Sequence, residues 1–295
     1  SKKIGRPLLS GLAILLVSWV FQNYDFSFSA EDGFFKKISV WKYKIFSPRP
    51  AKKAEFVFIN TGKDLTLVED TADYGNITVS DREKIYRLMK QINQNPDGPA
   101  FTVLDLQFYY PFSTDLRIDT LLREEISKNQ SVVIPVLKKS GGDYKMPLYE
   151  TAYAYSDYTT YGSGFNKFRI LRNGDYPSIP VLLHEKLENK EYKGPPFFAT
   201  CNGRLSLAAI WPTYYLRNET VRNNELDDFV QFYNLGELLM DIEANPANHA
   251  SYFKNRIVMV GNFEDDVHTT TLGKMSGPIL LANIYLSLLN DQHIV

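Results

Sequence analysis

Residues 101–137 read FTVLDLQFYYPFSTDLRIDTLLREEISKNQSVVIPVL and contain the clearest structural pattern of the chain. Phe101–Leu106 is an apolar run with the length of a buried strand, and Ser131–Leu137 is a second run of this kind. Between them, residues 118–126 repeat apolar side chains at the spacing of one helix face. Strand, helix and strand with short connections predict a right-handed crossover that joins two parallel strands.

The same alternation continues toward the N-terminus. Phe56–Ile59 is a strand-like run, and turn residues follow it at positions 60–62. Ser80 and Glu83 have the spacing of a capping box, which predicts that a helix begins here. That helix places four apolar residues on one face: Ile85, Leu88, Met89 and Ile92.

Toward the C-terminus, Arg256–Gly261 (RIVMVG) predicts another buried strand, followed by a loop from Asn262 to Ser276. Ser276 is then the expected N-cap of a helix through Leu289, with Pro278 in its first turn. Because this helix carries no charged residue, we expect it either to be buried on several sides or to lie at a membrane. Weaker patterns predict helices over 179–187 and 236–243 and strands over 197–201 and 228–233.

A membrane segment is predicted before this α/β region. Pro7–Tyr24 is free of charge for eighteen residues, which as a helix would span about 27 Å against a hydrocarbon thickness of about 30 Å. Lys2, Lys3 and Arg6 precede it, so the positive-inside rule leaves residues 1–6 in the cytoplasm. A cleavable signal peptide and a buried core helix are the competing interpretations.

The resulting organisation has five parts. Residues 1–6 form a cytoplasmic N-terminus, 7–24 a transmembrane helix, 25–54 a basic and aromatic connector, 55–290 a folded domain and 291–295 the start of a tail. The predicted fold class is α/β, a largely parallel sheet with helices on both faces, preceded by one N-terminal transmembrane helix. The connector is expected either to lie on a lipid surface or to pack its aromatic residues on the domain. The predicted location is the cytoplasmic (inner) membrane, with the domain on the periplasmic or extracellular side.

Composition narrows the function. Apolar residues make up 44 % and charged residues 23 %, which excludes a disordered or fibrous chain. Residues 1–55 hold ten basic residues against four acidic ones, so the remaining chain is mildly acidic and nucleic acid is not an expected partner. Cys201 is the single cysteine, which rules out an intrachain disulfide and a multi-cysteine metal site.

No strong catalytic motif is present, and polar groups near strand ends are the remaining candidates. Asp105 and Asp115 follow the second strand, where open α/β sheets bind ligands, although Asp115 equally suits the start of the next helix. In an extended segment, Glu264, Asp266 and His268 would project to one side as three metal ligands. The alternative is a solvated loop in which the acidic groups accept from backbone N–H groups.

Taken together, the ordered segments of the chain resemble the CHASE type-2 extracellular sensory domain, which lies between membrane helices of bacterial receptors. The resemblance covers about residues 55–290. It is carried by Lys63-Asp64-Leu65, Asp105, Asp115, Gly164-Phe165-Asn166, Asn173-Gly174-Asp175, Phe253–Gly261, Asp265-Asp266, Thr269-Thr270, Gly277-Pro278 and Ala282-Asn283. It implies that three further membrane helices follow, often with a cytoplasmic kinase or cyclase.

The sequence therefore predicts a membrane-anchored sensory domain that is not an enzyme and needs no cofactor. Its partners are the membrane and an unknown small ligand or envelope protein, and pairing with a second copy of the chain is left open. A structural or assembly subunit of an envelope complex is the alternative, and a metal-dependent hydrolase at Glu264, Asp266 and His268 is a third. The expected ligand-binding residues lie in loops after the parallel strands: Asn60, Asp64, Asp105, Asp115, Asp265, Asp266 and His268.

Overall fold

The computed structural model describes most of the chain from residue 48 onward. The described ranges are 48–70, 75–95, 97–111, 115–138, 144–156, 165, 167–170, 176–194, 199–226, 229–246 and 249–295, with scattered residues between 11 and 43. The predicted membrane helix over 7–24 and most of the connector lie outside the described residues. Among the described helices, none has the length and apolar character needed to cross a bilayer.

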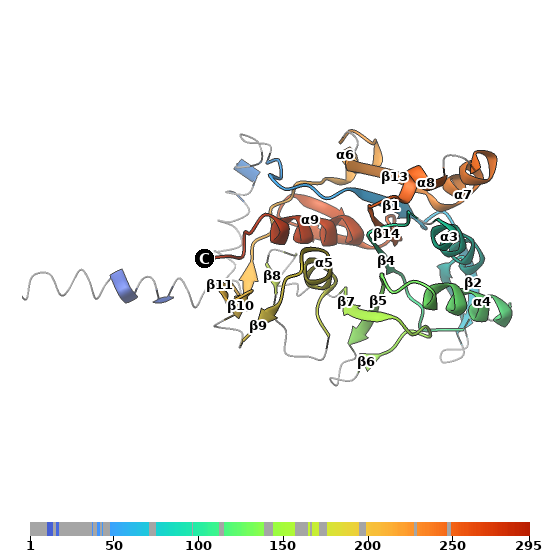
Figure 1. Ribbon diagram of the computed structural model, residues 1–295, viewed down its shortest axis with the longest axis horizontal. Helices are drawn as coiled ribbons and strands as arrows, with labels where there is room; N and C mark the ends of the chain where they lie inside the picture. Colours follow the sequence, from blue (N-terminus) through green and yellow to red (C-terminus); the bar gives the residue numbers. More distant parts are fainter. Residues whose placement is uncertain are drawn as a thin grey trace, which may run out of the picture.

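A seven-stranded sheet forms the centre of the domain (Figure 1). Its strands follow the order β13-β1-β14-β4-β5-β6, and β7 also pairs with β5. All pairings are parallel except that of β6 with β5. The strands are β1 (Phe56–Asn60), β4 (Phe101–Asp105), β5 (Val132–Lys138), β6 (Tyr144–Lys145), β7 (Ala152–Tyr155), β13 (Val230–Asn234) and β14 (Ile257–Gly261).

Helices cover both faces of this sheet, as expected from the alternating pattern. Along β1, Phe56 and Phe58 point into one apolar layer, whereas Val57 and Ile59 point into the other. One layer packs against α5 (Ile179–Glu188) and α9 (Gly277–Leu289), with the short α6 (Asn218–Arg222) at its edge. The opposite layer packs against α3 (Arg82–Gln94), α4 (Leu116–Ser127), α7 (Leu235–Ala244) and α8 (His249–Phe253).

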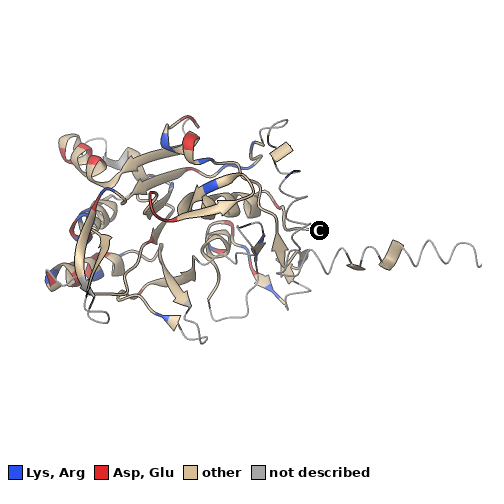
Figure 2. Cartoon of the chain, turned by 180° about the vertical axis from the view of Figure 1, so that it is seen from behind, with Lys and Arg blue, Asp and Glu red and all other residues tan. Residues whose placement is uncertain are grey.

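The uncharged helix α9 is buried along its whole length, and the charged residues lie mainly on the outer elements (Figure 2). Its polar residues are satisfied inside the domain. Asn283 Oδ1 accepts from the backbone N–H groups of Tyr215 at 2.7 Å and Leu216 at 2.8 Å, and Ser287 Oγ accepts from Thr213 N at 3.0 Å. The helix therefore lacks charged residues because it is buried against the sheet and α5. This confirms the expectation that it is buried on several sides.

Two local expectations are wrong. The N-cap of α3 is Asp81, which accepts from Glu83 N and Lys84 N, because Ser80 is the last residue of a strand instead. That strand, β3 (Gly75–Ser80), forms a hairpin with β2 (Leu65–Asp70). The predicted loop after β14 also contains a hairpin, β15 (Val267–Thr270) with β16 (Gly273–Ser276). The strands of both hairpins carry many exposed or polar residues, so neither has the apolar pattern of a buried strand.

The remaining strands form small two- and three-stranded sheets beside the central one. They are β8 (Phe168–Arg169) with β12 (Ala209–Ile210), and β9 (Tyr192–Lys193), β10 (Ala199–Cys201) and β11 (Arg204–Ser206).

The segment before β1 lies beside the end of α9. Lys52 N donates to Asn290 Oδ1 at 2.8 Å, and Asn290 Nδ2 donates to Lys52 O at 3.0 Å. Tyr43 lies farther toward the N-terminus, and the guanidinium of Arg217 stacks on its ring at 4.1 Å from the ring centre. Tyr43 also packs against the core, so at this residue the connector rests on the domain.

Candidate functional site

The site is built at the carboxyl ends of two neighbouring strands, β4 and β14. The helix after β4 (α4) packs on one face of the sheet, whereas the helix after β14 (α9) packs on the other. The two connections therefore diverge, which is the point in an open α/β sheet where a crevice opens for ligands. The last residues of these strands, Asp105 and Gly261, are direct partners across the sheet.

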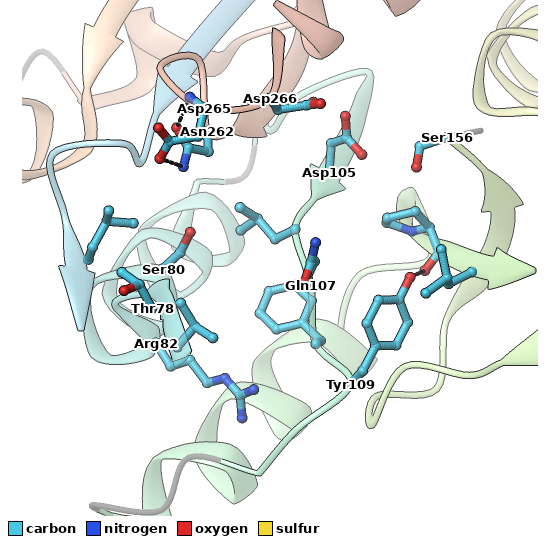
Figure 3. A pocket seen from close by; sticks show the side chains of 16 residues that line it. Thr78, Ser80, Arg82, Asp105, Gln107, Tyr109, Ser156, Asn262, Asp265 and Asp266 are labelled. Atoms are coloured by element: carbon cyan, nitrogen blue, oxygen red, sulfur yellow. Dashed lines mark hydrogen bonds between the residues drawn. The ribbon is translucent and has the colours of Figure 1, made fainter. Parts of the chain in front are cut away.

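A polar cavity of about 460 Å³ lies at this divergence (Figure 3). Its walls come from six parts of the chain: the β2–β3 hairpin, the first residue of α3, the end of β4 with the segment after it, the second half of β5, the residue after β7, and the loop after β14. The polar residues that its chemistry depends on are Arg82, Asp105, Gln107, Ser156, Asn262 and Asp266.

Asp105 is the most perturbed group of the cavity. Its Oδ2 atom is buried and has no hydrogen-bond partner within the described part of the chain, while Ser156 hydrogen bonds to the same carboxyl group. Burial, together with the nearby charge of Asp266, raises the pKa of Asp105 to about 8. The carboxyl group is therefore mostly protonated at neutral pH and can donate or accept a hydrogen bond.

Asp266 lies between the hairpin β15–β16 and the first turn of α9. One of its carboxylate oxygens contacts His268 Nε2 at 2.8 Å. The other lies so close to Gly277 that a Cβ atom at position 277 would overlap it, so a larger residue there would displace the Asp266 side chain. The backbone of Asp266 also accepts from Gly277 N at 2.8 Å. Asp266 thus places a negative charge at the positive end of the α9 dipole.

Asp265 is oriented by a turn that Asn262 closes. Asn262 Oδ1 accepts from the backbone N–H groups of Glu264 at 3.0 Å and Asp265 at 3.1 Å, and Asn262 Nδ2 donates to Asp265 Oδ2 at 2.9 Å. The loop alternative for this segment is thus correct in one respect, since an Asx-type turn satisfies its backbone. The acceptor is Asn262 rather than an acidic residue.

Three of the other predicted ligand residues do not line the cavity and instead make structural hydrogen bonds. Asn60 is fully buried and bridges to Asn234 Oδ1 at 3.1 Å. Asp64 pairs with Lys84 at 2.6 Å and caps the start of α7 through Gly236 N at 3.1 Å. Asp115 is the N-cap of α4, as its alternative interpretation proposed.

The three expected metal ligands of the loop after β14 do not converge. Glu264 turns toward Arg222, whose Nη1 contacts both carboxylate oxygens at 3.1 Å, and it also accepts from Asn60. Asp266 and His268 instead contact each other. Among the described residues, the alternation of an extended strand therefore does not bring these three side chains to one point.

Sequence reasoning missed the buried cation beneath the cavity. Arg82, in the first turn of α3, is almost fully buried, and its guanidinium bonds to Asp119 of α4 and to the carbonyl of Tyr110. Tyr149 also donates to Asp119, at 2.8 Å. The position of Arg82 in the sequence was a signal, because Arg82 lies three residues before Ile85 and seven before Met89, on the apolar face of the helix. Gln107 could have been considered with Asp105, because it lies in the segment directly after the same strand.

Comparison with known proteins gives one match. The family model described as the CHASE2 domain matches residues 13–295, nearly the whole chain. No curated protein and no solved structure matches the chain.

Proposed function

Since the chain belongs to the CHASE2 domain family, whose members are extracellular sensory domains of signalling receptors, we propose that it detects a small, positively charged ligand in the cavity between β4 and β14. The observation that carries this proposal is the buried Asp105 oxygen that has no described partner and faces the cavity beside Asp266. A ligand with an ammonium or similar donor group would supply the missing hydrogen bond and the missing positive charge.

The charges around the cavity support a cationic rather than an anionic ligand. Asp105, Asp265 and Asp266 gather at one side. Arg82 also lines the cavity, but its guanidinium is bonded to Asp119, which offsets its charge. Asp265 and Asp266 therefore make the field at the cavity negative, and Asp105 adds to it when it ionises, which favours a bound cation.

A thermal-shift screen of small organic amines, matched with neutral alcohols of the same size, tests the proposal. An amine at about a hundred times its Kd would stabilise the domain by about 2.7 kcal/mol and raise its Tm by about 5–10 °C. Because Asp105 must ionise to pair with the amine, affinity should rise as the pH increases toward 8. Asp266→Asn should weaken the shift, whereas Asp115→Asn, which changes a carboxylate outside the cavity, should keep it. Equal responses to amines and alcohols would refute the cationic ligand.

We further propose that the cavity binds its ligand without converting it, so the domain acts as a receptor rather than as an enzyme. The amine found by the screen is incubated with the protein and then examined by mass spectrometry. Recovery of the unchanged amine after many binding half-lives is the expected result, and a new product in the wild-type sample alone would contradict it.

Membrane anchoring is part of the same proposal. The uncharged run over residues 7–24 supports an N-terminal anchor that leaves the domain outside the cytoplasmic membrane. External protease added to intact spheroplasts should then digest the domain. Protection in intact cells, with digestion only after lysis, would place the domain inside.

A further inference from the structure

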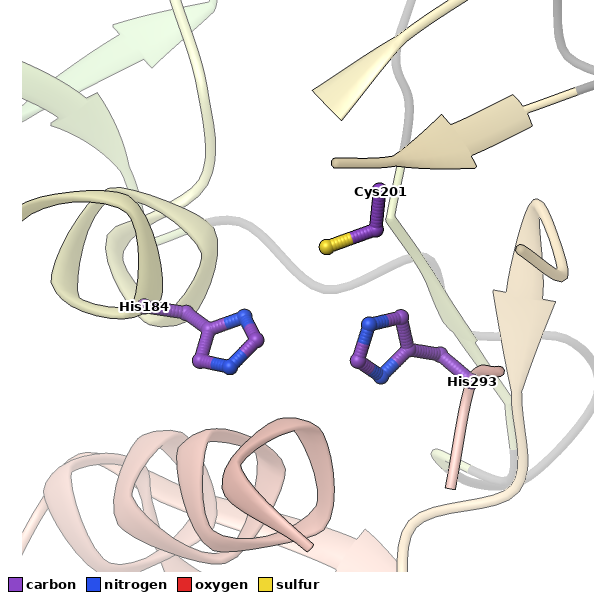
Figure 4. Close-up of side chains that lie close together, drawn as sticks. All are labelled: His184, Cys201 and His293. Atoms are coloured by element: carbon purple, nitrogen blue, oxygen red, sulfur yellow. The ribbon is translucent and has the colours of Figure 1, made fainter. Parts of the chain in front are cut away.

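A second group of chemically reactive side chains lies in the core, away from the cavity described above. His184 belongs to α5, Cys201 to β10, and His293 to the segment after α9 (Figure 4). All three side chains are buried. They come from positions widely separated in the sequence, so only the folded chain brings them together.

The three side chains face one another with their ligand atoms. One ring nitrogen of each histidine and the sulfur of Cys201 all lie within 4.8 Å of one another. The Tyr192 hydroxyl lies 2.7 Å from His184 Nδ1 and 3.2 Å from His293 Nε2. Tyr192 also hydrogen bonds to Cys201, so its hydroxyl lies at the point that the three side chains face and must leave that point when an ion binds.

We propose that His184, Cys201 and His293 form a binding site for one thiolate-binding transition-metal ion, copper or zinc. Two imidazoles and one thiolate are ligands that both metals accept. With bonds of about 2.0 Å to nitrogen and 2.3 Å to sulfur, the ligand atoms of a bound ion lie roughly 3.3–3.7 Å apart. The ligand atoms of the described cluster, which lie within 4.8 Å of one another, must therefore approach by up to about 1.5 Å through side-chain rotation when the ion binds.

Metal binding replaces the S–H bond of Cys201 with a bond from the sulfur to the ion. The Cys201 thiol loses its proton to solvent as the sulfur–metal bond forms, while each histidine contributes a lone pair from a neutral ring. No oxidant or reductant is needed. The Tyr192 hydroxyl orients the two rings before the ion arrives, and it is not required as a ligand.

Charge balance favours copper(I) over zinc at this position. A copper(I) ion with one thiolate is neutral, whereas a zinc ion with one thiolate keeps a net positive charge that burial makes unfavourable. Asp291, the carboxylate two residues before His293, is already paired with Lys52 at 3.0 Å. Two histidines and one cysteine are also the three strong ligands of trigonal copper sites.

Metal analysis of the full chain, purified in mild detergent after growth with copper, zinc or cobalt, tests this proposal. The expected result is close to one ion per chain, with copper retained against a chelator more strongly than zinc. In the cobalt sample, a thiolate-to-cobalt absorption band should appear in the near ultraviolet. Because Cys201 is the single cysteine of the chain, this band would identify its sulfur as a ligand without any variant.

Variants then identify the other ligands. Cys201→Ser should abolish the band, and His184→Gln or His293→Gln should lower metal content at least tenfold. Tyr192→Phe should still bind, and His249→Gln, at the first residue of α8, should behave as wild type. If a ligand variant does not fold, the wild-type band and stoichiometry decide the question. A wild-type chain without the band and with less than a tenth of an ion would show that the cluster is only a hydrogen-bonded part of the core.

Discussion

Asp105 lies where burial and a neighbouring carboxylate disfavour its ionised form. Its carboxyl group is buried at the end of a central strand, next to a second carboxylate, and the consequence is a pKa of about 8 rather than the ordinary value of 3.8. Between these two pH values the folded state binds a proton that the unfolded state releases. The stability of the domain therefore falls as the pH rises through this interval, as far as Asp105 is concerned.

Asp105→Asn should remove this dependence, since an amide resembles the protonated carboxyl group and does not titrate. We expect the variant to gain about 2–4 kcal/mol relative to wild type between pH 5 and pH 8. Denaturant unfolding at both pH values measures the difference. Asp115→Asn is the control, because it changes a carboxylate outside the cavity and asparagine caps a helix about as well as aspartate. If the stability of Asp105→Asn relative to wild type were the same at both pH values, the raised pKa of Asp105 would be contradicted.

Gly277→Ala tests the contact between Asp266 and the first turn of α9. The added Cβ atom would overlap the Asp266 carboxylate, so the Asp266 side chain must move away from its present position. We expect a loss of about 1–3 kcal/mol in stability and a weaker response to amines in the thermal-shift screen. A variant with wild-type stability and response would show that Asp266 does not need its position against α9.

At the scale of single residues, the sequence located the acidic side of the cavity but not its other walls. Asp105, Asp265 and Asp266 were predicted from the rule that ligands bind beyond strand ends, and all three line the cavity. The rule does not tell which polar residue remains open to a ligand. Asn60 and Asp64 also follow a strand, but backbone N–H groups and Lys84 occupy them. That competition depends on elements distant in the sequence.

At the scale of elements, α9 joins the core through a buried polar residue. Asn283 Oδ1 accepts from two backbone N–H groups of the segment after β12, and its Nδ2 donates to Leu216 O at 3.0 Å and Ile279 O at 3.0 Å. An uncharged helix can slide against apolar neighbours, whereas these directional bonds fix its position.

Asn283→Leu should therefore destabilise the domain despite the added apolar surface. The substitution leaves the N–H groups of Tyr215 and Leu216 buried without an acceptor, which costs about 2–4 kcal/mol in the free energy of unfolding. Urea unfolding gives the measurement. Asn223→Leu, at the exposed end of α6, should change stability by less than about 1 kcal/mol. Equal losses in both variants would show that the bonds of Asn283 contribute little.

Elements with a buried face were predicted well, and those without one were not. β1, β14, α3 and α4 have apolar residues at the correct period because one or both faces contact the core. The hairpins β2–β3 and β15–β16 form through backbone pairing with each other, with several exposed side chains. Because nothing demands apolar residues there, composition does not reveal them.

At the scale of the whole molecule, the strand order was beyond sequence reasoning. Parallel crossovers predict the handedness of each connection, but β14, the last strand of the sheet in the chain, inserts between β1 and β4. This insertion depends on how the apolar layers of all strands fit together. It is also what creates the divergence of α4 and α9 and hence the cavity.

The contact between the two ends of the domain gives a prediction at the same scale. Asn290→Ala removes both hydrogen bonds to the backbone of Lys52. We expect faster amide exchange over residues 50–54, with a loss of less than about 1.5 kcal/mol in global stability because these groups are exposed. Hydrogen exchange followed by mass spectrometry measures it, with α3 as the internal reference. Unchanged exchange near Lys52 would show that this contact does not hold the segment.

One helix reaches from the acidic cavity to the segment that leads back toward the N-terminus. Gly277, at the start of α9, contacts Asp266, and Asn290, just after its end, holds Lys52. Thirteen residues separate these contacts, about 20 Å of rigid backbone. A displacement of Asp266 can therefore reach Lys52 only if α9 moves as one rigid body, and such a movement requires the hydrogen bonds between Asn283 and the segment after β12 to rearrange.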